Sequence, residues 1–112
     1  MLEKKNRICK NKEFDRVFTG QSFYAKVLGI KSVDNKLNET RFGILVGLKV
    51  SKKAVVRNKL KRQIRAIISQ ELPLIKSGKD LVIITMVPIL SLEFEDIKET
   101  LKMGLKKLNL YK

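Results

Sequence analysis

The spacing of hydrophobic residues changes from segment to segment along the chain and predicts a mixture of helices and strands. Over residues 56–68 the apolar positions recur every three or four residues, which is the pattern of an amphipathic helix. Residues 41–50 alternate instead, and this predicts a strand with one core face made of Phe42, Ile44, Val46, Leu48 and Val50. Residues 80–88 are almost continuously apolar, which predicts a strand in the middle of a sheet, covered on both sides.

A short helix is predicted over residues 12–19, with Gly20 as its stop. One side of it is apolar and consists of Phe14, Val17 and Phe18. The plainer interpretation is a helix held against the sheet by its aromatic rings. The alternative is that part of this side lines a groove for unstacked nucleotide bases, which the basic neighbours Lys12 and Arg16 would favour.

The remaining segments are less regular. Residues 23–33 alternate well enough for a strand and are followed by turn residues. Gly43 and Gly47 share one face of the next predicted strand, and because glycine weakens a strand, we expect a helix or, as second choice, a ligand to approach closely there. Ser91 is predicted to cap a last helix, in which apolar residues repeat over residues 94–108.

These elements predict an α+β fold in one domain that spans residues 1–112. The expected architecture is an α/β sandwich, in which helices pack on one mixed, four-stranded sheet in the order α-β-β-β-α-β-α. A chain of 112 residues is long enough to bury a single core of this kind. We find no internal repeat or linker that would divide it.

Basic residues dominate the charge of the chain and gather in one stretch. The sequence has 25 Lys and Arg against 11 Asp and Glu, and residues 49–69 contain eight of the basic residues and no acid. On the predicted helix, one broad exposed face carries Arg57, Asn58, Lys61, Arg62 and Arg65. Like charges four residues apart repel by about 0.2–0.5 kcal/mol per pair. This density of positive charge therefore favours a polyanionic partner over a solvated face, which would normally mix both signs.

The composition disfavours several classes of function. The chain has no histidine, and catalysis by the protein itself is not expected without the usual general base. Cys9 is the single cysteine and cannot form an internal disulfide, so we expect a cytoplasmic protein. No apolar run reaches the roughly 18–20 residues that cross a bilayer, so we expect no membrane span. The acids clustered over residues 93–99 suit the positive end of a helix dipole better than a magnesium site.

The basic stretch resembles the signature helix of the bacterial ribonuclease P protein component. Residues 57–65, RNKLKRQIR, are similar to that family's RN-x-x-KR-x-x-R motif, and a Val-Ser-Lys-Lys run precedes them as it does in the family. Residues 6–18 resemble the family's N-terminal segment. One departure is that family members usually carry a short Gly-containing insert where Lys53 runs directly into Ala54.

This resemblance implies a function and a set of contact residues. In that family the protein assists a catalytic RNA in removing the 5′ leader of precursor tRNA, so the chemistry and its magnesium ions would belong to the RNA, with no cofactor on the protein alone. The implied RNA-binding residues are Lys52, Lys53, Arg57, Asn58, Lys61, Arg62, Arg65 and Arg7. The implied leader-binding cleft contains Phe14, Phe18 and Lys31, the last where some members carry a Tyr.

The resemblance also implies a left-handed crossover through the basic helix, whereas the general rule for parallel strands predicts a right-handed one. We expect a monomer in a 1:1 complex with the catalytic RNA. A ribosomal-protein-like or DNA-binding module would use the same basic helix and stays open as an alternative. A helix on a membrane surface and an independent nuclease are the remaining candidates.

Overall fold

The principal helices and strands follow one another in the predicted order. In the computed structural model, which describes residues 4–8 and 11–112, they are α1 (Asn11–Val17), β1 (Gln21–Tyr24), β2 (Leu28–Asp34), β3 (Arg41–Leu45), α2 (Ala54–Glu71), β4 (Lys79–Thr85) and α3 (Phe94–Lys107). Short 3-10 helices at Lys4–Asn6 (η1), Leu72–Leu74 (η2) and Val87–Ser91 (η3) lie between or before them. Cys9 falls outside the described residues.

The strands form one mixed sheet, as predicted, in the order β1-β2-β4-β3. β2 pairs antiparallel with β1 and β4, and β3 pairs parallel with β4. The apolar strand β4 therefore lies in the interior of the sheet, as its continuous run of hydrophobic residues predicted. β3 lies at one side, where the backbone N–H of Ile8 donates to the carbonyl of Phe42 at 2.9 Å.

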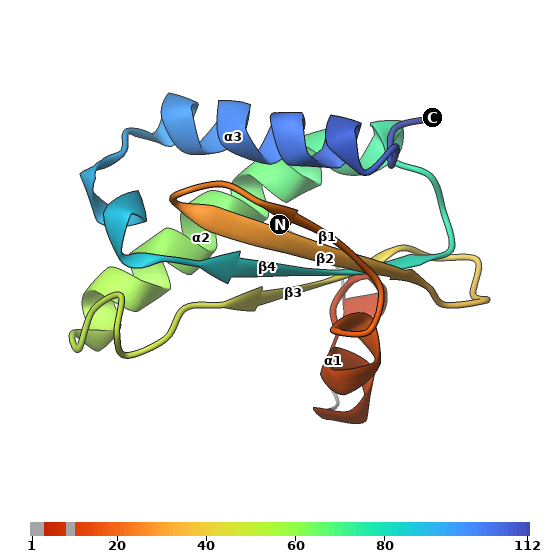
Figure 1. Ribbon diagram of the computed structural model, residues 1–112, viewed down its shortest axis with the longest axis horizontal. Coiled ribbons are helices and arrows are strands. Elements are labelled where there is room, and N and C mark those ends of the chain that lie inside the picture. Colours follow the sequence, from red (N-terminus) through yellow and green to blue (C-terminus); the bar gives the residue numbers. More distant parts are fainter. Residues whose placement is uncertain (1–3, 9–10) are drawn as a thin grey trace.

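Helices α2 and α3 cover one face of this sheet and α1 lies on the other (Figure 1). The main core forms between the two long helices and the sheet, around Leu60, Ile64 and Ile67 of α2 and the buried residues of β2 and β4. α3 rests closely on β1 and β2, because a Cβ at Gly104 would lie only 2.5 Å from Cδ1 of Ile30. Stable packing thus uses the face that the helical periodicity predicted.

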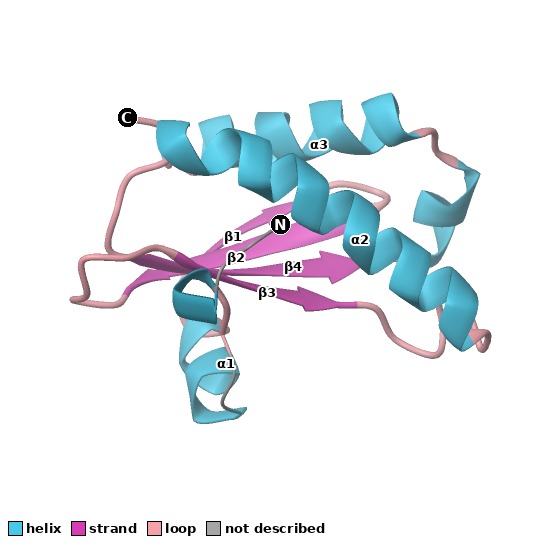
Figure 2. Cartoon of the chain, turned by 180° about the vertical axis from the view of Figure 1, so that it is seen from behind, coloured by secondary structure: helices cyan, strands magenta, loops and turns pink. Residues whose placement is uncertain are grey.

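The connection from β3 through α2 to β4 is left-handed. In Figure 2 α2 lies in front of the sheet, and when the strands are turned to point upward, β4 lies to the left of β3. A right-handed connection would place it to the right. The general rule is therefore wrong for this chain, and the expectation from the family resemblance is confirmed.

On the opposite face, α1 packs through its apolar side. Val17 is fully buried with Ile8 and Val82, and Phe14 lies against Gly43, where a Cβ would come within 2.4 Å of the ring. The expected helix contact at Gly43 is therefore present. Gly47 lies beyond the end of β3, and the space around it is open.

Three strand predictions were wrong in their extent. The strand predicted over residues 80–88 ends at Thr85 and is followed by η3. Residues 23–33 are not one strand but parts of β1 and β2, which turn at residues 25–27, where the N–H of Ala25 donates to the carbonyl of Leu28 at 2.9 Å. β3 ends at Leu45 rather than at residue 50, so Leu48 is 67% exposed instead of buried. The alternation continued beyond the strand, but without a partner strand the segment forms a turn.

The predicted cap of the last helix was also wrong. Ser91 belongs to η3, where its hydroxyl donates to the carbonyl of Pro88 at 2.8 Å, and Glu93 is the residue before α3. The apolar stripe of α3 is as predicted, with Ile97, Leu101 and Leu105 buried. None of the described helices is both long and apolar enough to span a bilayer.

Candidate RNA interface

The basic face of α2 is set by the residues that the helix buries. Leu60, Ile64, Ile67 and Ile68 point into the core, which leaves Asn58 and Arg62 exposed and Arg57, Lys61 and Arg65 along the half-buried flank. Lys52 and Lys53 are exposed just before the helix. The structure thus brings these seven predicted residues together on α2 and the turn that leads into it.

The cations on this face have few competing contacts. Arg57 is held in place, since its Nη1 donates to the carbonyl of Ser51 at 2.9 Å. Within the described part of the chain, Lys61, Arg62 and Arg65 form no ion pair. Lys53 precedes the helix in an extended conformation and makes no side-chain capping bond. Cations without ion-pair partners along α2, together with Lys53 just before its N-terminus, form an arrangement suited to phosphate.

Arg7 lies apart from α2, at the outer side of β3. Its backbone bridges to Phe42, and the residue is exposed. The structure therefore places Arg7 at an edge of the sheet, separate from the residues on α2.

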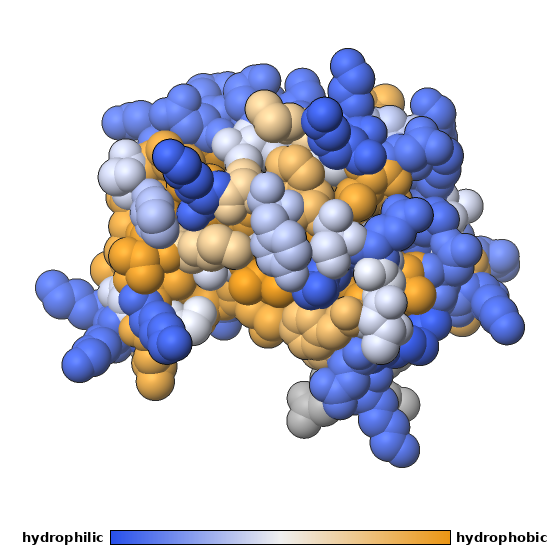
Figure 3. All heavy atoms as spheres, in the orientation of Figure 1, coloured by the Kyte–Doolittle hydropathy of each residue, from blue (hydrophilic) through white to orange (hydrophobic). Residues whose placement is uncertain are grey.

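An aromatic patch lies on the sheet face that carries α1. We use this name for Phe18, Tyr24 and Lys31; Phe14 lies farther along the sheet, on Gly43 of β3. The Nζ of Lys31 lies 5.9 Å from the ring centroid of Phe18 and 5.4 Å from that of Tyr24. Phe18 is 38% exposed and Tyr24 is 57% exposed. Figure 3 shows hydrophobic atoms at the surface over the strands of this face, with hydrophilic side chains around them. Rings of this kind are available to stack on bases.

Strand register explains how the patch forms. Ser22 pairs with Lys31 and Tyr24 with Gly29, so Tyr24 and Lys31 share one face of the β1-β2 hairpin. The hydroxyl of Ser22 accepts a hydrogen bond from Lys31 Nζ at 3.0 Å. A Cβ at Gly29 would lie 2.8 Å from the Tyr24 ring, so the glycine lets this ring lie against the strand. Sequence reasoning missed Tyr24, because in one continuous strand residues seven apart would point to opposite faces.

A buried carboxylate joins α1 to the sheet. Asp80 at the start of β4 is fully buried and accepts hydrogen bonds from Arg16 Nη2 at 2.8 Å, Asn35 Nδ2 at 2.8 Å, Arg41 Nε at 2.8 Å and Arg41 Nη2 at 2.6 Å. Burial alone would raise the pKa of Asp80, but the hydrogen bonds and the charge of Arg41, with those from Asn35 and Arg16, lower it. We call these four residues the Asp80 network. Arg16, which the sequence suggested as a nucleic-acid contact, belongs to it.

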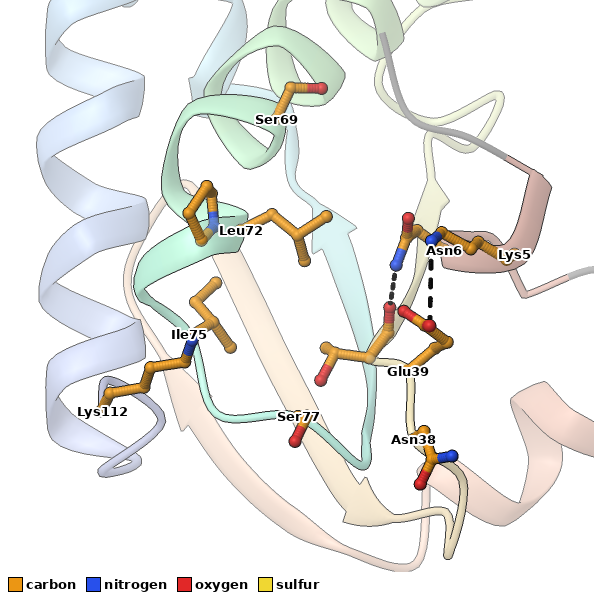
Figure 4. Close-up of a pocket in the computed structure, with 11 residues that line it drawn as sticks. Lys5, Asn6, Asn38, Glu39, Ser69, Leu72, Ile75, Ser77 and Lys112 are labelled. Carbon is orange, nitrogen blue, oxygen red and sulfur yellow. Dashed lines mark hydrogen bonds and ion pairs between the residues drawn. The ribbon is translucent and has the colours of Figure 1, made fainter.

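A separate cavity of about 410 Å³ lies at the far end of α2 (Figure 4). It is lined by side chains of η1, the β2-β3 turn and the segment after α2, and contains an ion pair of Lys5 with Glu39 at 3.8 Å. Asn6 closes one side by donating from Nδ2 to the carbonyl of Thr40 at 2.9 Å. None of the predicted RNA-binding residues lines it. No group of three or more potential metal-ligating side chains occurs among the described residues.

Comparison with known proteins agrees with this geometry. The family Ribonuclease P matches residues 2–109. The ribonuclease P protein component of Bacillus velezensis is 39% identical over 115 residues, which cover 99% of this chain and 96% of the relative. That of Bacillus mycoides is 44% identical over 104 residues, or 89% of this chain and 88% of the relative.

Solved structures show the same fold. A Staphylococcus aureus RNase P protein mutant with defective mRNA degradation activity superimposes with a TM-score of 0.90 at 31% identity, covering 97% of this chain and 92% of the other. The RNase P protein from Thermotoga maritima gives a TM-score of 0.81 at 29% identity, covering 90% and 96%. On the match over nearly its whole length, the chain belongs to the ribonuclease P protein family.

Proposed function

We propose that this protein, as the ribonuclease P protein component, docks on the catalytic RNA through the basic face of α2 and receives the 5′ leader of precursor tRNA on the aromatic patch. The observation that carries the proposal is the presence of two different RNA-suited surfaces on opposite faces of one sheet. One is rich in cations and the other in exposed rings. Family membership decides against the ribosomal-protein-like alternative.

The basic face suits a structured RNA. Cations without protein partners release counterions when they meet phosphates, and this supplies affinity that does not depend on sequence. Arg57, fixed by the Ser51 carbonyl, would present its guanidinium in one orientation close to Asn58 and the helix N-terminus. Lys52 and Lys53 would extend this surface along the preceding turn.

The aromatic patch suits single-stranded nucleotides. Leader bases are unpaired and can stack on exposed rings, which is worth about 1–3 kcal/mol per base. Lys31 lies between Phe18 and Tyr24, so a base on either ring would have an ammonium group beside it. Phe14 is more enclosed than Phe18 and packs on Gly43 of β3, so its role would be to hold α1 on the sheet.

The protein is a subunit of an RNA-processing endonuclease, and we place the chemistry in the RNA. The chain offers no histidine as general base, and the magnesium ions of the reaction would be bound in the RNA complex. We further propose a 1:1 complex of one protein with one RNA in the cytoplasm.

A reconstituted cleavage assay tests whether the RNA or the protein carries out the chemistry. Precursor tRNA should be cut by the catalytic RNA with the protein present, and the protein should matter most at low magnesium concentration, where the RNA alone binds substrate weakly. Purified protein without RNA should leave the substrate intact. Cleavage by the protein alone would place the active site in this chain and contradict the proposal.

Variants of the patch test leader binding. Phe18→Ala and Tyr24→Ala should each weaken binding of precursor tRNA by the holoenzyme by about tenfold, within the range of one lost stacking contact, and leave mature tRNA unaffected. Met103→Ala is a matched control, since Met103 is a similarly exposed apolar residue on α3, away from the patch. Equal loss for both tRNAs with a large fall in melting temperature would show that Phe18 serves the core instead.

A further inference from the structure

We propose that Arg16 is a positioning residue, which holds α1 so that Phe18 can stack on a leader base, and that it thereby sets the preference for precursor over mature tRNA. This inference rests on the proposed leader site. The side-chain hydrogen bonds of Arg16 go to Asp80 and to the carbonyl of Asp34, not to the aromatic patch. It acts indirectly, through its bonds to the Asp80 network and to the end of β2.

The contacts of Arg16 span two strands. Its Nη2 donates to Oδ2 of Asp80 at the start of β4, and its Nη1 donates to the carbonyl of Asp34 at the end of β2, both at 2.8 Å. A planar guanidinium that makes both bonds has little freedom to rotate. Arg16 lies in the last turn of α1, two residues before Phe18, so this fork fixes the end of the helix from which Phe18 projects.

α1 needs such a restraint because the helix is short. Seven residues form a marginal helix without tertiary contacts, and among the side chains of α1 that the structure describes, the other attachments to the sheet are the apolar contacts of Val17 and Phe14. Those contacts resist removal of the helix from the sheet, but they are non-directional and resist rolling or sliding poorly. The directional bonds of Arg16 supply the missing orientation.

Loss of Arg16 should leave the core intact. Asp80 would keep both hydrogen bonds from Arg41 and the one from Asn35, so its buried charge would still be compensated. The Arg16 side chain is 43% exposed, against 16% for Arg41, so its removal opens no deep cavity. The two arginines that bind the Asp80 carboxylate thus have different roles: Arg41 stabilises the fold, and Arg16 orients α1.

The rival explanation is that Arg16 binds an RNA phosphate directly. Arg16→Lys separates the two, because lysine keeps the charge but cannot bond to Asp80 and the Asp34 carbonyl as a planar fork. A positioning role predicts that Arg16→Lys behaves like Arg16→Ala. A phosphate contact predicts that lysine restores binding.

The experiment measures affinity of the reconstituted holoenzyme for precursor and mature tRNA with Arg16→Ala, Arg16→Lys, Phe18→Ala and the Arg16→Ala/Phe18→Ala double variant. Lys106→Ala is the control, since it removes one exposed positive charge from α3, on the opposite face of the sheet. Both Arg16 variants should weaken precursor binding by about three- to tenfold, part of one stacking contact, with mature tRNA unchanged. In the Phe18→Ala background, Arg16→Ala should add nothing further, because the two residues act as a unit.

Any of four results would overturn the inference: unchanged precursor binding in Arg16→Ala, full binding by Arg16→Lys, an additive loss in the double variant, or equal losses for both tRNAs with a lower melting temperature. If the wild-type holoenzyme itself showed no preference for precursor, the proposed leader site would fail first, whatever the Arg16 variants do.

Discussion

Removing Arg62 and Arg65 should change how RNA binding depends on salt, without changing the stability of the fold. Both lie on the exposed or flanking face of α2, and neither forms an ion pair within the described residues. Arginine and alanine are both good helix formers, so Arg62→Ala and Arg65→Ala should alter the free energy of unfolding by less than about 0.5 kcal/mol. Any loss of binding can then be assigned to contact with RNA.

The size of the effect follows from counterion release. Each neutralised phosphate contributes about 0.7–0.9 to the slope of log K against log salt concentration, so the double variant should flatten the slope by about 1.6. Between 50 and 200 mM salt, each lost contact then reduces the salt-induced change in affinity by about threefold. Filter binding or fluorescence anisotropy with the catalytic RNA over this range measures both quantities. Gln70→Ala, an exposed uncharged position on the same helix, is the control. An unaltered slope in the double variant would show that RNA docks elsewhere on the protein.

Three further predictions concern the fold around the two surfaces. Asp80→Asn should lower the free energy of unfolding by about 3–5 kcal/mol at neutral pH, because it breaks a buried ion pair, and thermal melts should show this loss. The pKa of Asp80 is lowered in the folded state, so its contribution to wild-type stability is present above the unfolded pKa near 3.8 and is lost as the pH falls through the folded pKa. The difference in stability between wild type and Asp80→Asn should therefore shrink in acid. Gly43→Ala should displace the Phe14 ring, 2.4 Å from the new Cβ, and weaken precursor binding more than mature binding in the tRNA assay; unchanged binding would mean that α1 does not contribute to the leader site. A Gly-containing tripeptide between Lys53 and Ala54 should be tolerated, because Lys53 is exposed and makes no capping bond; loss of cooperative unfolding would mean that this turn is packed.

The elements in which one hydrophobic pattern continues over many residues were predictable from the sequence. α2 has a stripe long enough to specify a helix, and β4 is apolar from Leu81 to Ile84 because it lies between two neighbours with helices on both sides. The basic face of α2 followed directly, since burying one side of a helix determines which residues lie on the other. Its orientation needed no knowledge of the rest of the fold.

The aromatic patch could not be predicted in full, because it depends on a turn with no sequence signal. Residues 25–27 are Ala, Lys and Val, without the Gly, Pro, Asn or Asp that normally mark a turn. The turn is fixed by pairing instead, including a bond from the N–H of Met86 to the carbonyl of Val27 at 2.9 Å. Without it, Tyr24 could not be assigned to the face of Lys31.

The Asp80 network also depends on tertiary structure. Asp80 begins a strand, where an acid usually marks a solvent-exposed end, and its partners come from residues up to 64 positions away in the sequence. A local pattern carries no information on such pairing. The same holds for Leu48, whose alternation with its neighbours continued after the partner strand had ended.

Because Lys31 lies close to two rings, its own side chain partly covers the stacking surface of the aromatic patch. With no RNA present, its ammonium lies near both Phe18 and Tyr24, and such cation–π contacts at exposed sites are worth about 0.5–1 kcal/mol. A leader base that took either ring face would move this ammonium to one side, and we expect this competition to weaken stacking by roughly two- to fivefold. In return, two exposed rings that would otherwise attract another copy of the chain stay hydrated. The ammonium would keep the Ser22 hydroxyl as a partner and gain a phosphate of the leader, and this exchange of contacts should make leader release fast.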